Sequence, residues 1–308
     1  MHSDMDIWQP EMGETLLSRT LVTFATGAAT PVRGMRWFRD TERNDIQNEL
    51  SGWPEGPVFT PRSTGGSLAR NIGKGGAIAL GGIFMAALSS AGGNISGSSG
   101  PRSGSDTPDN PDDEVKDFPV VWAAPGTIAR TLPWQLDPSR SSEKHYRTHA
   151  IVTDRRLVIV GFPYSKRNDA LIEDEVLWEI PRSQISRVEL KRFKDGNDVK
   201  ILFSDDSWCR LRAITCEKFT RYLLHPLELI PWSDLAPAQQ ITVEQFVATS
   251  GGPHAGTPFV SRRPCGHYRV ELLEPSQVDS FFGLSENDLL MDADGNEVEL
   301  KDYHPDDF

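Results

Sequence analysis

The sequence predicts a mainly β protein, with an ordered centre built as a barrel or sandwich of short strands closed by one helix. Short runs rich in β-branched and aromatic residues recur at regular spacing between residues 148 and 213, with turn-forming Asp, Gly and Asn between them. Such spacing is typical of all-β barrels and sandwiches. An amphipathic segment follows directly at residues 216–224. We expect a small α+β region after this centre, and before it a flexible N-terminal half with one Gly-rich hydrophobic helix.

The composition sets two limits on function. Apolar residues make up 38% of the 308 residues, below the usual range of about 45 to 50%, which indicates that a good part of the chain is linker. The net charge of -12 excludes a general nucleic-acid binder, because neutralising phosphates supplies most of that affinity. Residues 118–225 nevertheless carry 18 Lys and Arg against 14 Asp and Glu. We expect this basic island in an acidic chain to meet an anionic surface.

The cysteines and the first twenty residues bear on the compartment. Cys209, Cys216 and Cys265 form no C-x-x-C and leave one thiol unpaired under any pairing, so a reducing compartment is the simpler interpretation. The first twenty residues are acidic and lack an apolar core, which predicts no secretory signal peptide.

We expect residues 1–60 to be poorly ordered or partly helical. They contain one modest apolar stretch, residues 16–28, and one basic and aromatic cluster, residues 33–39. The cluster is suited to lying flat on a membrane or to packing on a neighbouring segment. Neither stretch builds a core by itself.

The Gly- and Ala-rich segment 72–93 is a candidate transmembrane helix. Residues 75–93 carry no charge over 19 positions, about the length that crosses a bilayer core as a helix. Small residues four apart would let two such helices approach closely in lipid, which favours self-association. A flexible linker and a buried helix are the alternatives, because six glycines weaken the hydrophobicity. The large apolar residues of this membrane segment are Ile78, Leu80, Ile83, Phe84, Met85 and Leu88.

Residues 94–117 predict an acidic flexible tether. They contain Gly, Ser, Pro and acidic residues with almost nothing to bury. Such a composition gives a solvated chain that repels itself.

The ordered domain is predicted for residues 118–225. Alternation in runs such as Val199-Lys200-Ile201 predicts strands with one face toward a core and one toward water. We expect one interior to be lined by Leu157, Ile159, Val188, Leu190, Ile201 and Phe219. The predicted strands are 120–122, 129–132, 148–152, 156–160, 176–180, 185–192, 199–203 and 208–213, and the closing helix is 216–224.

This order of elements resembles a bacterial pleckstrin-homology-like (PH-like) domain over about 105 residues. The resemblance is carried by the hairpin Thr153-Asp154-Arg155-Arg156, the strand pair beginning at Glu179-Ile180-Pro181, the Phe203-Ser204-Asp205-Asp206-Ser207 turn and the helix that follows. It implies a domain that recruits a protein or lipid and rarely catalyses. The acidic run 173–175 and the long insert 137–147 depart from the usual pattern near the ligand loop.

Residues 226–308 predict a small α+β region with an acidic tail. The run Thr242-Val243-Glu244-Gln245 is interpreted as the capping box of a short helix. Residues 268–273 predict a strand, 276–282 a second helix, and 298–300 an edge strand after a turn at 294–296.

Four basic residues form the candidate docking site for a ligand or partner. Arg155 and Arg156 lie in the predicted hairpin, and Lys166 and Arg167 follow the next strand. Adjacent loops of a PH-like barrel gather at one rim, where these side chains could converge on a phosphate. A structural role is the alternative, with Asp154 capping the turn and the Arg156 stem packed along the barrel wall.

No motif for catalysis, cofactor binding or metal binding is complete. The glycines around Lys74 fail the P-loop pattern at both ends, and no G-x-S-x-G or comparable nucleophile motif occurs. Cys265 and His267 offer a thiol and an imidazole, but no second C-x-x-C or H-x-x-x-H supplies further ligands. Residues 292–296 imitate a calcium loop without its twelfth-position glutamate, and are interpreted as a hairpin turn. We therefore predict a protein that is not an enzyme and holds no cofactor or metal.

These observations predict a membrane-associated adaptor that docks a partner protein or an anionic lipid through the PH-like domain. The alternative is a soluble cytoplasmic scaffold component of a larger assembly, with residues 72–93 as a linker or buried helix. Basic residues before segment 72–93 would place the domain outside the cell, whereas PH-like domains and free cysteines are usually cytoplasmic. We expect a cytoplasmic domain, and leave the orientation of the segment open.

Overall fold

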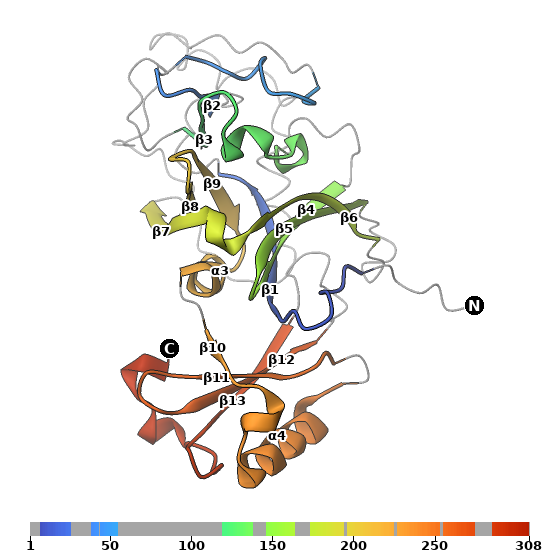
Figure 1. Cartoon of the computed structure of the whole chain (residues 1–308), viewed down its shortest axis with the longest axis vertical. Helices are drawn as coiled ribbons and strands as arrows, with labels where there is room; N and C mark the ends of the chain where they lie inside the picture. Colours follow the sequence, from blue (N-terminus) through green and yellow to red (C-terminus); the bar gives the residue numbers. More distant parts are fainter. Residues whose placement is uncertain are drawn as a thin grey trace, which may run out of the picture. The chain divides into compact units, whose positions relative to one another are not determined.

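The computed structural model describes residues 7–25, 38–42, 44–54, 119–137, 146–163, 173–193, 196–224, 227–252, 255–274 and 285–307. Within these ranges the protein is mainly β, with two α-helices (Figure 1). The chain forms two compact units. The first contains Met1–Val22, Glu143–Val188 and Ala213–Phe308, and the second contains Thr23–Ser142 and Glu189–Arg212. The predicted membrane segment and tether lie outside the described residues.

The first unit contains a curled half-barrel sheet with the strand order β1-β4-β5-β6 (Figure 1). All three pairings in this part of the sheet are antiparallel. Ile151, Val158 and Val160 form one hydrophobic cluster, and Trp8 and Leu16 pack against it. The bounds are β1 Leu16–Phe24, β4 Tyr146–Thr153, β5 Arg156–Pro163 and β6 Glu175–Pro181, so three strands predicted after residue 147 are confirmed.

Strand β1 corrects the expectation for the N-terminal region. Instead of poorly ordered or helical chain, residues 16–24 form a strand that pairs with β4. The sequence did not predict this strand because it contains the polar run Ser18, Arg19 and Thr20, and such residues usually lie at the surface. In the structure all three are buried. Ion pairing and hydrogen bonding, described below, compensate the burial of Arg19.

The second unit is built on a short sheet in the order β2-β3-β9-β8. Strand β2 runs parallel to β3, while β3 and β8 both run antiparallel to β9. Phe24, Phe38 and Trp53 form an aromatic cluster beside it, with ring centroids 5.0 to 5.8 Å apart. Phe38 therefore packs against neighbouring aromatic side chains, which agrees with one of the two alternatives for the basic and aromatic cluster 33–39. Residues 33–37 of that cluster lie outside the described residues. The bounds are β2 Phe38–Arg39, β3 Val121–Trp122, β7 Ile185–Phe193, β8 Gly196–Phe203 and β9 Trp208–Ala213.

Two sequence expectations for the second unit were wrong. Residues 129–132 were predicted as a strand, but Ile128–Thr131 is a 3-10 helix. The side chains of Asp205 and Ser207 accept hydrogen bonds from the backbone N–H groups of Ile128 and Ala129 at 2.5 and 3.1 Å, so these donors need no strand partner. Strand β8 was expected to expose Lys200 to water. Lys200 is instead buried, with its ammonium 4.1 Å from the centre of the Trp208 ring.

Helix α3 (Cys216–Leu224) occupies the predicted residues and buries Phe219, Tyr222 and Leu223. Of the six residues predicted to line an interior, Leu190 is half-buried and the other five are buried.

The remainder of the first unit is a four-stranded antiparallel sheet with α4 packed against one face (Figure 1). Its core joins Leu235, Val243 and Phe246 to strand residues that include Val270 and Leu272. The bounds are β10 Glu228–Leu229, α4 Pro237–Ser250, β11 Phe259–Arg262, β12 Tyr268–Glu274 and β13 Ser285–Met291.

Helix α4 begins earlier than the sequence analysis expected. Pro237 occupies its first position and the Gln239 side chain accepts a hydrogen bond from the Ala236 backbone N–H at 2.9 Å, which together start the helix. Thr242 lies inside the helix and donates to the carbonyl of Gly295. The predicted edge strand at 298–300 is absent, and Leu300–Asp302 forms a 3-10 helix. The predicted helix 276–282 lies outside the described residues.

The predicted turn at 292–296 is confirmed, because it leads from β13 back to a single antiparallel bridge between Met291 and Glu297. The Asp292 carboxylate accepts hydrogen bonds from the backbone N–H groups of Asp294 and Asn296 at 2.9 and 2.8 Å. These bonds lower the pKa of Asp292, with the side-chain hydrogen bond from Asn296 as the largest cause.

Candidate functional site

The turn between β4 and β5 holds the two predicted docking residues that the structure describes. Thr153 Oγ1 accepts hydrogen bonds from the backbone N–H groups of Arg155 and Arg156 at 3.1 and 2.9 Å. Asp154 Oδ1 accepts a bond from the backbone N–H of Thr15 at 2.7 Å, which ties the turn to the chain entering β1. The turn is therefore fixed by its own Thr and Asp side chains, as such residues favour.

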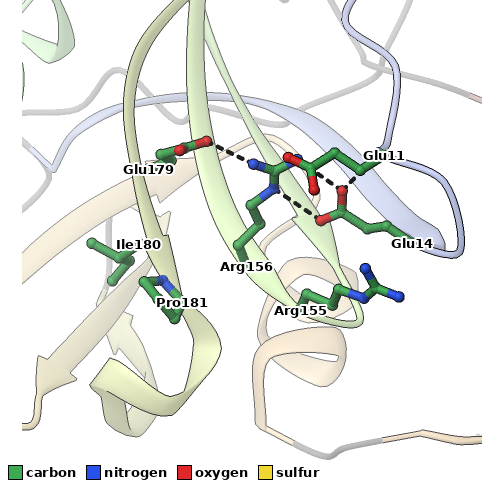
Figure 2. Close-up of a pocket in the computed structure, with 7 residues that line it drawn as sticks. All are labelled: Glu11, Glu14, Arg155, Arg156, Glu179, Ile180 and Pro181. Atoms are coloured by element: carbon green, nitrogen blue, oxygen red, sulfur yellow. Dashed lines mark hydrogen bonds and ion pairs between the residues drawn. The ribbon is translucent and has the colours of Figure 1, made fainter.

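Arg156 lies among three carboxylates. Its Nε and Nη2 donate to the two carboxylate oxygens of Glu14, both at 2.9 Å, and Nη1 donates to Glu179 at 3.0 Å. Glu11 lies 3.0 Å from Nη2. Figure 2 shows the guanidinium pointing toward these glutamates. Burial acts to raise the pKa of Glu14, but hydrogen bonds from Arg156, Thr153 and the Glu11 backbone N–H outweigh it, so the pKa is lowered.

Arg155 points away from this ion cluster (Figure 2). Its side chain is 52% exposed, and its carboxylate neighbour Asp154 is 3.9 Å away. Its guanidinium also donates to the carbonyl of Gly13. Gly13 has a φ of +74°, a backbone conformation that favours glycine. Arg155 therefore presents the more accessible positive charge of the two.

A shallow hollow of about 310 Å³ opens beside this turn. Its charged lining residues are three glutamates and two arginines, so the lining carries a small negative net charge. An anion entering the hollow would have to compete with the carboxylates that already bind Arg156. We name this surface the β4–β5 rim; it consists of Glu11, Glu14, Arg155, Arg156, Glu179, Ile180 and Pro181.

A buried ion network connected to the rim was missed by the sequence analysis. Arg19 donates to both carboxylate oxygens of Asp174 at 2.6 and 2.7 Å, and its Nε donates to Nδ1 of His149 at 2.9 Å. The side chains of Arg19 and Asp174 are each 1% exposed. The backbone N–H of Trp8 donates to Asp174 at 2.7 Å, while the Trp8 ring lies 5.5 Å from the guanidinium carbon of Arg156. Residue Trp8 thus links the buried network to the rim.

Arg182 fixes the rim from the side of α3. Its guanidinium donates to the carbonyl of Thr153 at 3.0 Å and to that of Tyr222 at 2.6 Å. The second bond satisfies a carbonyl in the last turn of α3 that has no helical partner. Burial lowers the pKa of Arg182, and Asp154 opposes this shift.

The structure brings together only part of the predicted docking site. Arg155 and Arg156 lie on the rim, whereas Lys166 and Arg167 lie outside the described residues, as do the six apolar residues of the predicted membrane segment. The acidic partners Glu11 and Glu14 lie about 140 residues from Arg156 in the sequence, and no local pattern could have connected them.

Among the helices of the described residues, none has the length and apolar character needed to cross a bilayer.

Comparison of the chain with protein-family models, with curated proteins and with solved structures found no match.

Proposed function

We propose that this protein is a non-enzymatic adaptor in which residues 118–225 form a PH-like domain that docks a partner protein at the β4–β5 rim. The order of elements supports the PH-like assignment, because strands β4 to β9 are followed directly by helix α3. The observation that carries the docking proposal is the fixed array of charges at the rim. Side chains held in place before binding lose less conformational entropy on association.

The charge of the rim favours a protein over an anionic lipid as the bound partner. Glu11 and Glu179 are 69% and 50% exposed and would repel lipid phosphate. A protein surface with one or two basic side chains and one acidic side chain would complement these glutamates and Arg155. Ile180 and Pro181 add an apolar contact in the same hollow.

Membrane association remains part of the proposal through residues 72–93 as the anchor. The tether 94–117 would give a root-mean-square reach of roughly 27 Å, which would keep the domain near the bilayer and raise its local concentration for a partner there. The second candidate function is a soluble scaffold component, in which residues 72–93 serve as a linker or buried helix.

The docking proposal is tested by placing a photo-crosslinking residue at position 155 of the full chain in cells, with position 228 as the control. We expect a discrete crosslinked protein from position 155 alone. The double variant Glu11→Lys with Glu179→Lys should remove the crosslink, while Glu228→Lys, which changes a carboxylate of similar exposure (63%), should retain it. Equal crosslinking from both positions would reject the rim as the docking surface.

The lipid alternative has its own measurement. Binding of the full chain to phosphatidylserine vesicles is compared for wild type and Arg155→Ala at low and physiological salt. We expect no difference between the proteins. A loss in the variant that is largest at low salt would assign the rim to anionic lipid, because exposed charges are screened over about 8 Å at physiological salt.

A further inference from the structure

The hairpin turn between β11 and β12 brings a thiol and an imidazole to one side of the chain. The backbone N–H of Arg263 donates to the carbonyl of His267 at 2.8 Å, and that of Gly266 donates to the carbonyl of Arg263 at 2.9 Å. Gly266 has a φ of +97°, which is strained for other residues. Cys265 and His267 therefore flank a tight glycine turn.

A carboxylate from the far end of the sequence meets both groups. Asp307 lies in the 3-10 helix Pro305–Asp307, and its side chain is 0% exposed. One carboxylate oxygen lies 3.1 Å from Cys265 Sγ and 3.1 Å from His267 Nδ1, and the other lies 2.9 Å from His267 Nδ1. That second oxygen also accepts a bond from the backbone N–H of His304 at 2.7 Å.

We propose that Cys265, His267 and Asp307 bind a zinc ion. The sulfur, the imidazole nitrogen and a carboxylate oxygen all lie within 4.8 Å of one another. Zinc bonds of about 2.0 to 2.3 Å at tetrahedral angles place ligand atoms roughly 3.3 to 3.6 Å apart. The carboxylate oxygen already lies 3.1 Å from both the sulfur and the imidazole nitrogen, so zinc binding needs mainly the sulfur and the nitrogen to approach each other. Asp307 is the ligand that the sequence analysis lacked when it predicted no metal site.

The mixed set of donor atoms selects the ion. Calcium and magnesium prefer oxygen ligands throughout, whereas zinc accepts thiolate, imidazole and carboxylate together. Cys265 and His267 are partly exposed, which provides a path for the ion and room for a water molecule as fourth ligand. Bound zinc would fasten the segment around residues 304–307 to the β11–β12 hairpin.

Binding requires a defined proton transfer. The Cys265 thiol loses its proton to solvent as the sulfur becomes a thiolate ligand. The neutral His267 ring carries its proton on Nε2 when Nδ1 binds the ion, and Asp307 binds as the carboxylate. One zinc ion therefore enters and one proton leaves, as expected for a thiol ligand.

The test uses the full chain freed of metal by a chelator and titrated with Co²⁺, then with Zn²⁺ in competition. We expect one Co²⁺ per chain with a thiolate-to-cobalt charge-transfer band, which Zn²⁺ abolishes. Cys265→Ser should lack the band although it retains Cys209 and Cys216. His267→Gln and Asp307→Asn should each weaken Zn²⁺ binding by at least about tenfold.

Asp306→Asn is the matched control, because Asp306 is the adjacent carboxylate but is 48% exposed and pairs with His304. Its metal affinity should equal that of wild type. Circular dichroism without metal checks the fold of each variant, and the partly exposed Cys265→Ser decides the question if Asp307→Asn does not fold. Absence of stoichiometric Co²⁺ binding, or an unchanged band in Cys265→Ser, would show that these three side chains form hydrogen bonds only.

Discussion

Asp198 in β8 and Arg210 in β9 are both buried, with the carboxylate 3.3 Å from the guanidinium Nε. Burial raises the pKa of Asp198 to about 6, and Arg210 and Arg212 oppose this shift only in part. In the unfolded chain the pKa of an Asp is about 3.9. Because the folded pKa is the higher one, the contribution of Asp198 to stability is present below pH ~4 and is lost as pH rises through about 6.

We therefore expect the free energy of unfolding of wild type to fall relative to that of Asp198→Asn between pH 4 and pH 7. Urea unfolding of both proteins across this range measures the difference. Asp206→Asn is the control, because Asp206 is exposed and its φ of +65° suits Asn as well as Asp. If wild type instead became more stable relative to Asp198→Asn as pH rises, the ion pair with Arg210 would outweigh the burial of Asp198.

Ile201 in β8 is fully buried, so Ile201→Ala should destabilise the protein by about 2 to 5 kcal/mol, from lost apolar burial and the cavity left behind. Leu190→Ala, at a half-buried position of the neighbouring β7, should cost less. Urea unfolding of the full chain compares the two variants. Equal losses would place both side chains in the same packing environment and contradict the burial described for β7.

Single residues show where sequence reasoning reaches its limit. The Thr153-Asp154-Arg155-Arg156 turn was predictable, because Thr and Asp form such turns through local hydrogen bonds. The glutamates around Arg156 and the Asp307 beside Cys265 were not, because only the folded chain brings residues so distant in sequence together. The burial of Lys200 was not predictable either, since its position in an alternating strand indicates a side chain exposed to solvent.

At the scale of elements, β1 makes the half-barrel depend on the N-terminal region. Residues 118–225 were predicted to form the ordered domain, but β4 pairs with β1 along five registered residue pairs from Leu16 to Leu21. We expect a fragment of residues 118–308 to expose this edge of β4 and its buried face, and to aggregate or unfold. Residues 7–308 should fold like the full chain.

Urea unfolding and amide-proton dispersion by NMR distinguish the two fragments. Addition of a peptide of residues 7–25 to the shorter fragment should restore cooperative unfolding if β1 is the missing element. A stable fragment 118–308 with native dispersion would show that β1 is an accessory strand.

The bond between Arg19 in β1 and Asp174, next to β6, gives a second test at this scale. Asp174→Asn should destabilise the protein by about 3 to 5 kcal/mol, because it leaves the buried guanidinium without a compensating charge. The double variant Arg19→Met with Asp174→Leu should recover much of that loss, since two apolar side chains replace the pair. Chemical unfolding of Arg19→Met, Asp174→Leu and the double variant gives the coupling energy.

Glu299→Gln, in a pair that is about 70% exposed on both sides, serves as the control and should leave stability unchanged. A double variant less stable than Asp174→Asn would indicate that Arg19 stabilises the strand mainly through His149.

Elements with a clear hydrophobic period, such as β4 to β9 and α3, were predictable from the sequence. Strand β1 was not, because its ion pair permits polar residues in a buried strand.

At the scale of the whole molecule, the proposed anchor decides between the two candidate functions. Replacing Ile83 and Phe84 with Asp should cost several kcal/mol of membrane insertion if residues 72–93 lie in hydrocarbon. We expect wild type to remain with carbonate-washed membranes and the double variant to move to the soluble fraction. The control is Met12→Asp with Leu300→Asp, which adds the same charge at side chains that are 98% and 82% exposed. Complete recovery of wild type in the soluble fraction would favour the scaffold function.

The pairing of β1 with β4 also has a consequence for the time course of synthesis. Arg19 and its hydrogen-bond partner His149 are 130 residues apart, and translation proceeds at about 5 to 20 residues per second, so β1 waits roughly 6 to 26 s for its partner strand. During this interval a strand with five large apolar residues leaves the ribosome without a sheet to join. The charge of Arg19 within it opposes aggregation. A chaperone that binds nascent chains should therefore crosslink to residues 16–24 until the ribosome has released β4, and ribosome profiling of chaperone-bound nascent chains would time that release.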